Sequence, residues 1–289
     1  MLPPRAPRGR SCSIVRLGDL ESVESVERTR VVRSFLYCGT LSSMRILFFD
    51  TETTGNGDGD RLCQLAVKER YVDEPLINAL YKPPVPISLE SMAIHHITEK
   101  MVGERPAFKD APEYSGIKDL FESDEVIPVA HNAAFDLAMF AREGIVPKRS
   151  ICTYKLAYAL DPDDTLPNYR LQYLRYLLDL DVEAEAHDAW GDVLVLEALF
   201  ERLLQKMIGR HGTEEAALGA MLALSARPLL FTTLRFGKYN GRRIEEVATT
   251  DPSYLRWLLE QKKQAPAGEE DWIYTLEHYL GQGSTMSHP

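Results

Sequence analysis

Five residues in three separate segments have side chains suited to metal-assisted hydrolysis. They are Asp50 and Glu52 in DTETTG (50–55), Asp136 in HNAAFD (131–136), and His187 and Asp192 in HDAWGD (187–192). Carboxylate oxygens, without thiols or a histidine cluster, are the ligands that Mg²⁺ and Mn²⁺ accept more readily than zinc does. We therefore predict that the four acids bind divalent metal.

Four carboxylates can hold two such ions. Two ions about 3.5–4 Å apart can clamp both the attacking and the leaving oxygen of a phosphoryl group. A histidine, whose unperturbed pKa is about 6.5, can take a proton from the attacking water near neutral pH. The pattern predicts a two-metal nuclease with His187 as the general base. Its predicted metal ligands are Asp50, Glu52, Asp136 and Asp192.

The residues around these segments predict the elements that must position them. The apolar run 45–50 is rich in strand formers, so we expect a buried strand with the first two acids at its end. Side chains at i and i+2 of a strand share a face, which places Asp50 and Glu52 close enough to share a cation. A second strand at 126–130 leads into a helix over 133–142 that carries Asp136. A long helix over 188–207 carries Asp192, with His187 just before it.

With all three motifs in this order, the chain resembles the DEDDh class of 3′→5′ exonucleases in the ribonuclease H-like superfamily. DTETTG matches the first motif of that class, AHNAAFD the second and AHDAWGD the third. Further segments at 91–98, 151–157, 236–248 and 251–258 resemble exodeoxyribonuclease X and its relatives. The likeness extends over roughly residues 44 to 281.

The resemblance implies an α/β fold of the ribonuclease H-like exonuclease type, with a five-stranded mixed sheet flanked by helices. It also implies hydrolysis of DNA from the 3′ end, release of nucleoside 5′-monophosphates and dependence on Mg²⁺, for which Mn²⁺ is expected to substitute. Under the resemblance, Thr53 and Asn132 contact the terminal nucleotide. For Asn132, a turn-capping role is the alternative.

Two segments depart from the pattern of the class. Asn56 and Gly57 stand where an apolar residue often packs near the terminal base, which argues against base stacking there. Gln64 stands where a glutamate is common, so any supporting role of that acid is lost or altered. Among the other histidines, His95 is expected in a structural turn, and His131 is expected to support its loop rather than bind metal.

Composition changes along the chain predict five regions. Residues 1–43 are rich in arginine and start with several prolines, and they form either a disordered basic arm or an over-long start ahead of Met44. The predicted regions that follow are the exonuclease domain at 44–210, a connecting helix at 211–228, a small C-terminal module at 229–282 and a disordered tail at 283–289.

The C-terminal module contains a strong turn signal. Asn240-Gly241 between two strand-like runs predicts a hairpin with a type I′ turn, followed by helices that start at Asp251-Pro252 and at about residue 270. The hairpin carries Lys238, Arg242 and Arg243 near Tyr239. Basic groups beside an aromatic ring suit a contact with single-stranded nucleic acid, which we predict here. The alternative is a solvated hairpin whose tyrosine packs locally.

Composition also limits the classes of protein that fit. The 289 residues, 45% of them hydrophobic, suffice for one sizeable core and a small second unit. Four cysteines without CxxC spacing, and no apolar run of membrane length, predict reduced thiols, no membrane partner and a cytoplasmic location. The formal net charge of −10 predicts modest, salt-sensitive affinity for long DNA.

Two other functions fit the same residues. An exoribonuclease acting on RNA ends would use the same five side chains, because only contacts to the 2′ position separate the two sugars. A polymerase-associated proofreading or docking subunit would share the acids, with docking as its main work. The predicted substrate is a DNA 3′ end, single-stranded or duplex, and the sequence names no protein partner.

Overall fold

The computed structural model describes residues 41–184, 187–264 and 268–283 of the chain. The predicted N-terminal extension therefore lies outside the described residues except for 41–43, and the predicted tail lies outside them except for Gly283. Leu41–Ser43 form a 3₁₀ turn (η1), and the side chain of Leu41 packs against the main hydrophobic core. Packed structure thus begins ahead of Met44. The predicted division into five regions stays a prediction.

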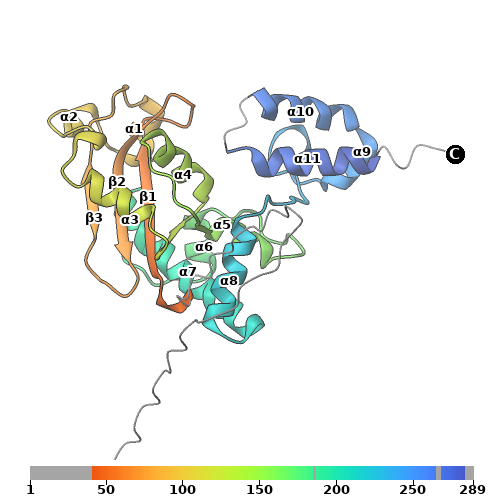
Figure 1. Cartoon of the computed structure of the whole chain (residues 1–289). Helices are drawn as coiled ribbons and strands as arrows, with labels where there is room; N and C mark the ends of the chain where they lie inside the picture. The colour runs from red at the N-terminus through yellow and green to blue at the C-terminus, as the bar shows by residue number, and fades with distance from the viewer. Residues whose placement is uncertain (1–40, 185–186, 265–267, 284–289) are drawn as a thin grey trace, which may run out of the picture. The chain divides into compact units, whose positions relative to one another are not determined.

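A mixed sheet lies at the centre of the predicted exonuclease domain, called the exonuclease part below (Figure 1). Its strands are β1 (Arg45–Thr53), β2 (Leu62–Glu69), β3 (Ile77–Leu80), β4 (Val126–Ala130) and β5 (Ile151–Cys152). The five strands run in the order β3-β2-β1-β4-β5. β1 is antiparallel to β2 and parallel to β4, while β3 and β5 extend the two edges. The predicted five-stranded mixed sheet is confirmed.

β1 is longer than the apolar run that predicted it. The run ends at Asp50, but pairing with β2 continues with Glu52 opposite Gln64 and Thr53 opposite Leu62. The ladder can continue past the apolar side chains because strand pairing joins peptide groups. Asp50 and Glu52 therefore lie within the strand rather than after it.

Helices cover both faces of this sheet (Figure 1). The helices are α1 (Leu89–His95), α2 (Glu99–Val102), α3 (Tyr114–Phe121), α4 (Ala133–Arg142), α5 (Thr153–Ala159), α6 (Leu171–Leu177), α7 (Ala189–His211), α8 (Glu214–Ser225), α9 (Ile244–Thr250), α10 (Pro252–Gln264) and α11 (Glu270–Gly283). Residues of α5, α7 and α8 pack with Ile46 and Phe48 on one face, and residues of α3 and α4 pack with Leu47 and Phe49 on the other. Alternate residues of β1 thus enter two cores.

The helices that position the motifs follow the sequence prediction closely. α4 spans the predicted 133–142, and α7 begins at Ala189 but continues to His211, past the expected end at 207. α8 confirms the helix expected after Thr213, whose hydroxyl caps it by accepting the N–H of Ala216 at 3.2 Å. The predicted C-terminal helices are confirmed as α10 and α11.

The type I′ turn predicted for the hairpin of the C-terminal module is wrong. A single antiparallel bridge joins Thr233 and Arg243. The N–H of Arg242 donates to the carbonyl of Tyr239 at 3.0 Å, and φ is −51° at Asn240 and +83° at Gly241. These angles fit a type II turn, whereas type I′ requires positive φ at both central residues.

Gly237 lies in the loop between the two paired segments. Its φ of +68° turns the chain into a 3₁₀ segment (η3, Gly237–Tyr239) before the Asn-Gly pair is reached. A side chain at this glycine would meet the hydroxyl of Tyr254 at 2.4 Å, so the turn depends on glycine. The type II turn then closes the loop, and the N–H of Leu234 donates to the carbonyl of Arg242 at 2.9 Å.

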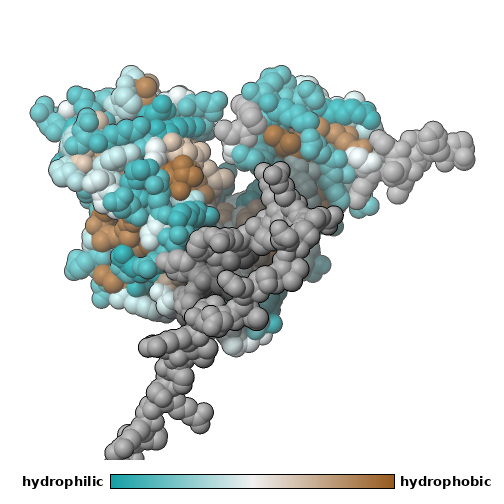
Figure 2. Space-filling view, in the orientation of Figure 1, coloured by the Kyte–Doolittle hydropathy of each residue, from teal (hydrophilic) through white to brown (hydrophobic). Residues whose placement is uncertain are grey.

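Specific hydrogen bonds join the C-terminal module to the exonuclease part. Thr232 donates its N–H to the Tyr158 hydroxyl at 2.9 Å and its own hydroxyl to Asp164 at 2.6 Å. Lys155 on α5 pairs with Asp271 on α11 at 3.0 Å. On the visible surface, hydrophilic residues predominate, with separate hydrophobic patches (Figure 2).

Candidate active site

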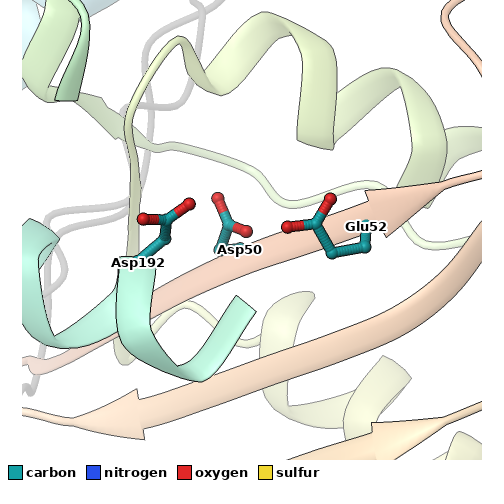
Figure 3. Close-up of side chains that lie close together, drawn as sticks. All are labelled: Asp50, Glu52 and Asp192. Carbon is teal, nitrogen blue, oxygen red and sulfur yellow. The ribbon is translucent and has the colours of Figure 1, made fainter. Parts of the chain in front are cut away.

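Three carboxylates converge between β1 and the first turn of α7. Asp50, Glu52 and Asp192 each offer one oxygen, and these atoms all lie within 4.8 Å of one another. Figure 3 shows Asp50 and Glu52 rising from the strand beside Asp192 from the helix. Along β1 the two acids continue the row of Ile46 and Phe48, which is the face that α7 covers. The structure therefore brings together three of the four predicted metal ligands.

Asp136 lies apart from this group because it reaches β1 from the other face. Its helix, α4, packs on the opposite side of the sheet, and its carboxylate accepts the N–H of Thr51 at 3.1 Å and the Thr51 hydroxyl at 2.7 Å. Asp136 is buried, at 3% exposure, and its charge still contributes to raising the pKa of Asp50. Thr51, which the sequence analysis did not single out, holds this acid beside the cluster.

The cluster carries strong negative charge. Burial, followed by repulsion from Asp136 and Glu52, raises the pKa of Asp50 well above its usual range. Burial and the charge of Asp192 raise the pKa of Glu52 to about 8. Burial raises the pKa of Asp136 to about 7, although the hydrogen bonds from Thr51 oppose that rise. Carboxylates held together in this way are stabilised in their charged form by a cation.

Gln172 on α6 orients Asp192. Its side-chain amide donates to Asp192 Oδ1 at 2.5 Å. Burial raises the pKa of Asp192, and the Gln172 hydrogen bond and the charge of His187 act against that rise. Sequence reasoning missed Gln172 because a glutamine in an ordinary amphipathic helix carries no signal until the partner acid is placed.

Gln64 supports the start of α7. Gln64 lies on β2, directly opposite Glu52 of β1. Its side-chain amide donates to Asp188 Oδ1 at 3.0 Å, and its side-chain carbonyl accepts the N–H of Ala189 at 3.4 Å. Asp188 in turn caps α7 by accepting the N–H of Gly191 at 3.2 Å. A glutamate at this position would have no proton to donate near neutral pH, so glutamine fits an aspartate cap here. The position that departs from the class thus has a structural reason.

His187 lies where the sequence predicted, immediately before the cap of α7. The side chain is exposed, and its backbone has φ +61°. It lines the same cleft as Asp192, and its charge influences that carboxyl group. The imidazole is therefore accessible to solvent beside the acid cluster.

The neighbouring residues of the second motif have separate roles. His131 Nε2 lies 2.8 Å from the carbonyl of Tyr169 and Nδ1 lies 2.9 Å from the Thr153 hydroxyl. Burial lowers the pKa of His131 to about 4, so the ring is neutral and structural. Asn132, in the left-handed region with φ +62°, makes no side-chain capping bond and is exposed in the cleft. Its amide is available to a ligand.

The residues around the first motif are more enclosed. The Thr53 hydroxyl donates to the carbonyl of Gly55 at 2.7 Å, so it is already engaged. His95 is buried and lies with Nε2 3.1 Å from the carbonyl of Thr53, which agrees with the structural turn expected for it. The proposed substrate contact of Thr53 stays a prediction.

A cleft of about 830 Å³ adjoins the acid cluster. Asn132, His187 and Asp192 line it from the exonuclease part, together with the start of α6. Phe236, Lys262 and Trp272 line it from the C-terminal module. The predicted basic contacts lie elsewhere: Lys238 pairs with Asp251 at 3.1 Å and Arg242 pairs with Glu246 at 3.1 Å, while Arg243 precedes α9. Their contact with nucleic acid stays a prediction.

Comparison with known families decides the class of this chain. A family model described as Exonuclease matches residues 47–200, which is more than half of the chain and runs from β1 to α7. The chain belongs to the exonuclease family. A second model, described as Exodeoxyribonuclease X-like C-terminal, matches residues 234–263 of this exonuclease. The predicted resemblance and fold class are confirmed.

Curated relatives of the exonuclease agree with this assignment. Exodeoxyribonuclease 10 of Escherichia coli (strain K12) is 35% identical over 236 residues, covering 80% of this chain and 96% of that protein. A DNA polymerase III subunit epsilon-like protein of Rhodobacter capsulatus is 31% identical over 180 residues, covering 59% of this chain and 25% of that protein. A solved structure of exonuclease X in complex with 5′ overhanging duplex DNA has a TM-score of 0.48 and 28% identity, covering 63% of this chain and 99% of that one.

None of the helices in the described part of the exonuclease is both long enough and apolar enough to cross a lipid bilayer. The cytoplasmic location stays a prediction.

Proposed function

We propose that this exonuclease is a metal-dependent 3′→5′ exodeoxyribonuclease that releases nucleoside 5′-monophosphates. The observation that carries the proposal is the convergence of Asp50, Glu52 and Asp192, from two distant segments, within 4.8 Å. The choice of DNA is supported by the name of the 35% identical relative, exodeoxyribonuclease 10, which this chain covers almost completely.

The donor set fits hard divalent cations. All three clustered groups are carboxylates, and the two cysteines in the described residues, Cys63 and Cys152, are buried and separate from the cluster. Oxygen donors of this kind suit Mg²⁺, with Mn²⁺ as a substitute. We propose two ions, held by Asp50, Glu52 and Asp192 with Asp136 completing the set. Bound there, the ions would polarise the phosphate and lower the pKa of a coordinated water.

The remaining residues have proposed roles in proton transfer and positioning. The exposed imidazole of His187, beside Asp192, accepts the proton of the attacking water on one of its ring nitrogens. Gln172 fixes the carboxylate of Asp192, and Thr51 fixes that of Asp136. The side-chain amide of Asn132, which is exposed in the cleft, contacts the terminal nucleotide. The backbone of Thr53, next to Glu52 in the sequence, is the second proposed contact.

One assay tests this function. End-labelled single-stranded DNA, duplex DNA and RNA of one sequence are incubated with the full chain and Mg²⁺, with chelator as the control. We expect stepwise shortening of DNA from the 3′ end and release of nucleoside 5′-monophosphates, abolished by chelator. Faster shortening of the RNA would assign the chain to exoribonucleases. No shortening of any substrate would favour the docking subunit.

A further inference from the structure

The cleft beside the acid cluster has walls from two parts of the chain. Asn132, His187 and Asp192 form the wall nearest the acids. Phe236 and Trp272, from segments far along the sequence, line the cleft from the C-terminal module. A nucleotide bound at the acids would therefore lie in the same cleft as the residues that the C-terminal module contributes.

The wall that the C-terminal module contributes is aromatic, and its rings pack against one another. The ring centroid of Trp272 lies 4.4 Å from that of Phe231 and 4.9 Å from that of Phe236. Thr275, one turn further along α11, accepts the N–H of Phe231 at 3.0 Å, which fixes the segment at Phe231 against the helix. Flat, preorganised rings of this kind are stacking platforms for bases of any sequence.

Among the described residues that line the cleft, Arg170 is a cation for which no ion pair is found. Lys262 pairs with Glu269 at 2.6 Å, and Asp271 pairs with Lys155 at 3.0 Å, so the acids of the module wall are balanced. Arg170 is exposed in the cleft, and its guanidinium makes no ion pair within the described ranges. A free guanidinium at the edge of an aromatic cleft suits a phosphate group.

Arg170 is also connected to the acid cluster through the backbone. It precedes α6, and two residues later Gln172 donates to Asp192. Both side chains line the cleft. A DNA strand whose 3′-terminal phosphodiester lies at the acids would therefore place another of its phosphates near Arg170.

We propose that the C-terminal module holds the single-stranded stretch of DNA that precedes the 3′-terminal nucleotide. Bases stack against Trp272 and Phe236, and Arg170 binds a phosphate of the same stretch. This proposal rests on the proposed exodeoxyribonuclease function and adds a specific binding role for the module. It makes the efficiency of hydrolysis depend on substrate length.

The test compares kcat/KM on a dinucleotide and on a long oligothymidylate, with the full chain and Mg²⁺. Stacking is worth about 1–3 kcal/mol per base, so Trp272→Ala is expected to lower kcat/KM on the long substrate by roughly 5- to 150-fold, with the loss confined to that substrate. Trp272→Phe keeps an aromatic ring and is expected to restore most of the loss.

Arg170→Ala supplies a second readout that does not depend on the packing of the module. Each phosphate contact to a single strand contributes about −0.7 to the slope of log affinity against log salt. Removing Arg170 is expected to make the slope for the long oligothymidylate shallower by about that amount. The dinucleotide, which has only the scissile phosphate, is expected to show no change in slope.

Matched controls lie on α10 outside the cleft. Trp257 is 55% exposed and Arg256 is also exposed, and neither lines the cleft. Trp257→Ala and Arg256→Ala are expected to leave both substrates unaffected. An equal loss on both substrates for Trp272→Ala, or an unchanged salt slope for Arg170→Ala, would overturn the proposal. A wild-type chain that hydrolyses no DNA would instead overturn the proposed function.

Discussion

Asp50 illustrates how a metal site opposes the folding of its own apoprotein. Burial and neighbouring carboxylates raise its pKa well above the usual range. The folded metal-free protein must therefore either take up a proton or bear the repulsion, and both cost free energy near neutral pH. The negative charge that destabilises the metal-free fold is the same charge that would attract a cation.

We expect Asp50→Asn to abolish activity and to stabilise the metal-free protein. The substitution keeps the shape but removes a ligand, and metal catalysis supplies several kcal/mol, so activity falls by about 10³-fold or more. The metal-free Tm rises, because the neutral amide needs no proton. Activity assays and thermal unfolding with chelator measure the two effects.

Asp73→Asn is the control, since Asp73 is exposed and distant in sequence from the motifs. It is expected to change neither quantity. Retention of activity in Asp50→Asn would contradict the proposed mechanism.

His187→Ala is expected to be milder than loss of a metal ligand. General-base catalysis contributes about 10²–10⁴-fold, and the acid cluster stays intact without the imidazole. The expected result is a fall of kcat within that range with little change in the Mg²⁺ concentration needed for half-maximal rate. His96→Asn is the control, because His96 is exposed with φ +62° and asparagine tolerates that conformation. A mutant requiring far more Mg²⁺ would place His187 among the ligands.

At the scale of elements, the N-terminus of α7 decides where Asp192 lies. Its cap, Asp188, accepts a hydrogen bond at 3.0 Å from Gln64 of β2, so this side chain links α7 to the strand that pairs with the acid-bearing β1. The sequence indicated that Gln64 differs from the class. Only the structure shows that glutamine at this position donates to Asp188, the N-cap of α7.

We expect Gln64→Glu to destabilise the protein by about 1–3 kcal/mol, the usual cost of a buried group left without its partner. The new carboxylate would face Asp188 with no proton to donate near neutral pH. Chemical denaturation measures the change. Adding Asp188→Asn is expected to recover most of the loss, because asparagine also caps helices and its amide can donate to the introduced acid. Additive losses in the double variant would count against this account.

At the scale of the whole molecule, metal binding and pH are linked through the acid cluster. A raised carboxyl pKa means that the folded metal-free state holds protons that the unfolded state has released. Its stability therefore falls as pH rises from about 4, the ordinary carboxyl pKa, to about 8, the pKa of Glu52. Mg²⁺ binds the deprotonated carboxylates, so its stabilising effect must grow through the same window.

The expected outcome is a larger rise in Tm on adding Mg²⁺ at about pH 9 than at about pH 6. Thermal unfolding with and without Mg²⁺ at the two pH values measures it. Asp50→Asn is expected to shrink the difference, since one of the raised carboxyl groups is gone. A Tm shift that is the same at both values would show that the cluster does not control metal binding.

The sequence predicted the local elements well where one physical rule dominates. Apolar runs rich in strand formers located β1 and β4, and the helices expected from about 188 and after Thr213 agree with the starts of α7 and α8. It failed at the type I′ turn, because a 3₁₀ segment that starts at Gly237 and a type II turn at Asn240-Gly241 connect the two segments instead. Short-range turn signals compete, and sequence alone does not rank them.

The sequence by itself determined that Asp50 and Glu52 share a face, because side chains at i and i+2 of a strand point to the same side. It also determined the class of protein, which the match over residues 47–200 confirmed. Only the tertiary structure decided that Asp192 joins Asp50 and Glu52 while Asp136 arrives from the opposite face, bonded to Thr51. The same holds for the contact of Gln172 with Asp192 and for the aromatic wall at Trp272. These arrangements depend on how helices pack across a sheet, and contacts between residues so distant in the chain leave no periodic pattern in the sequence.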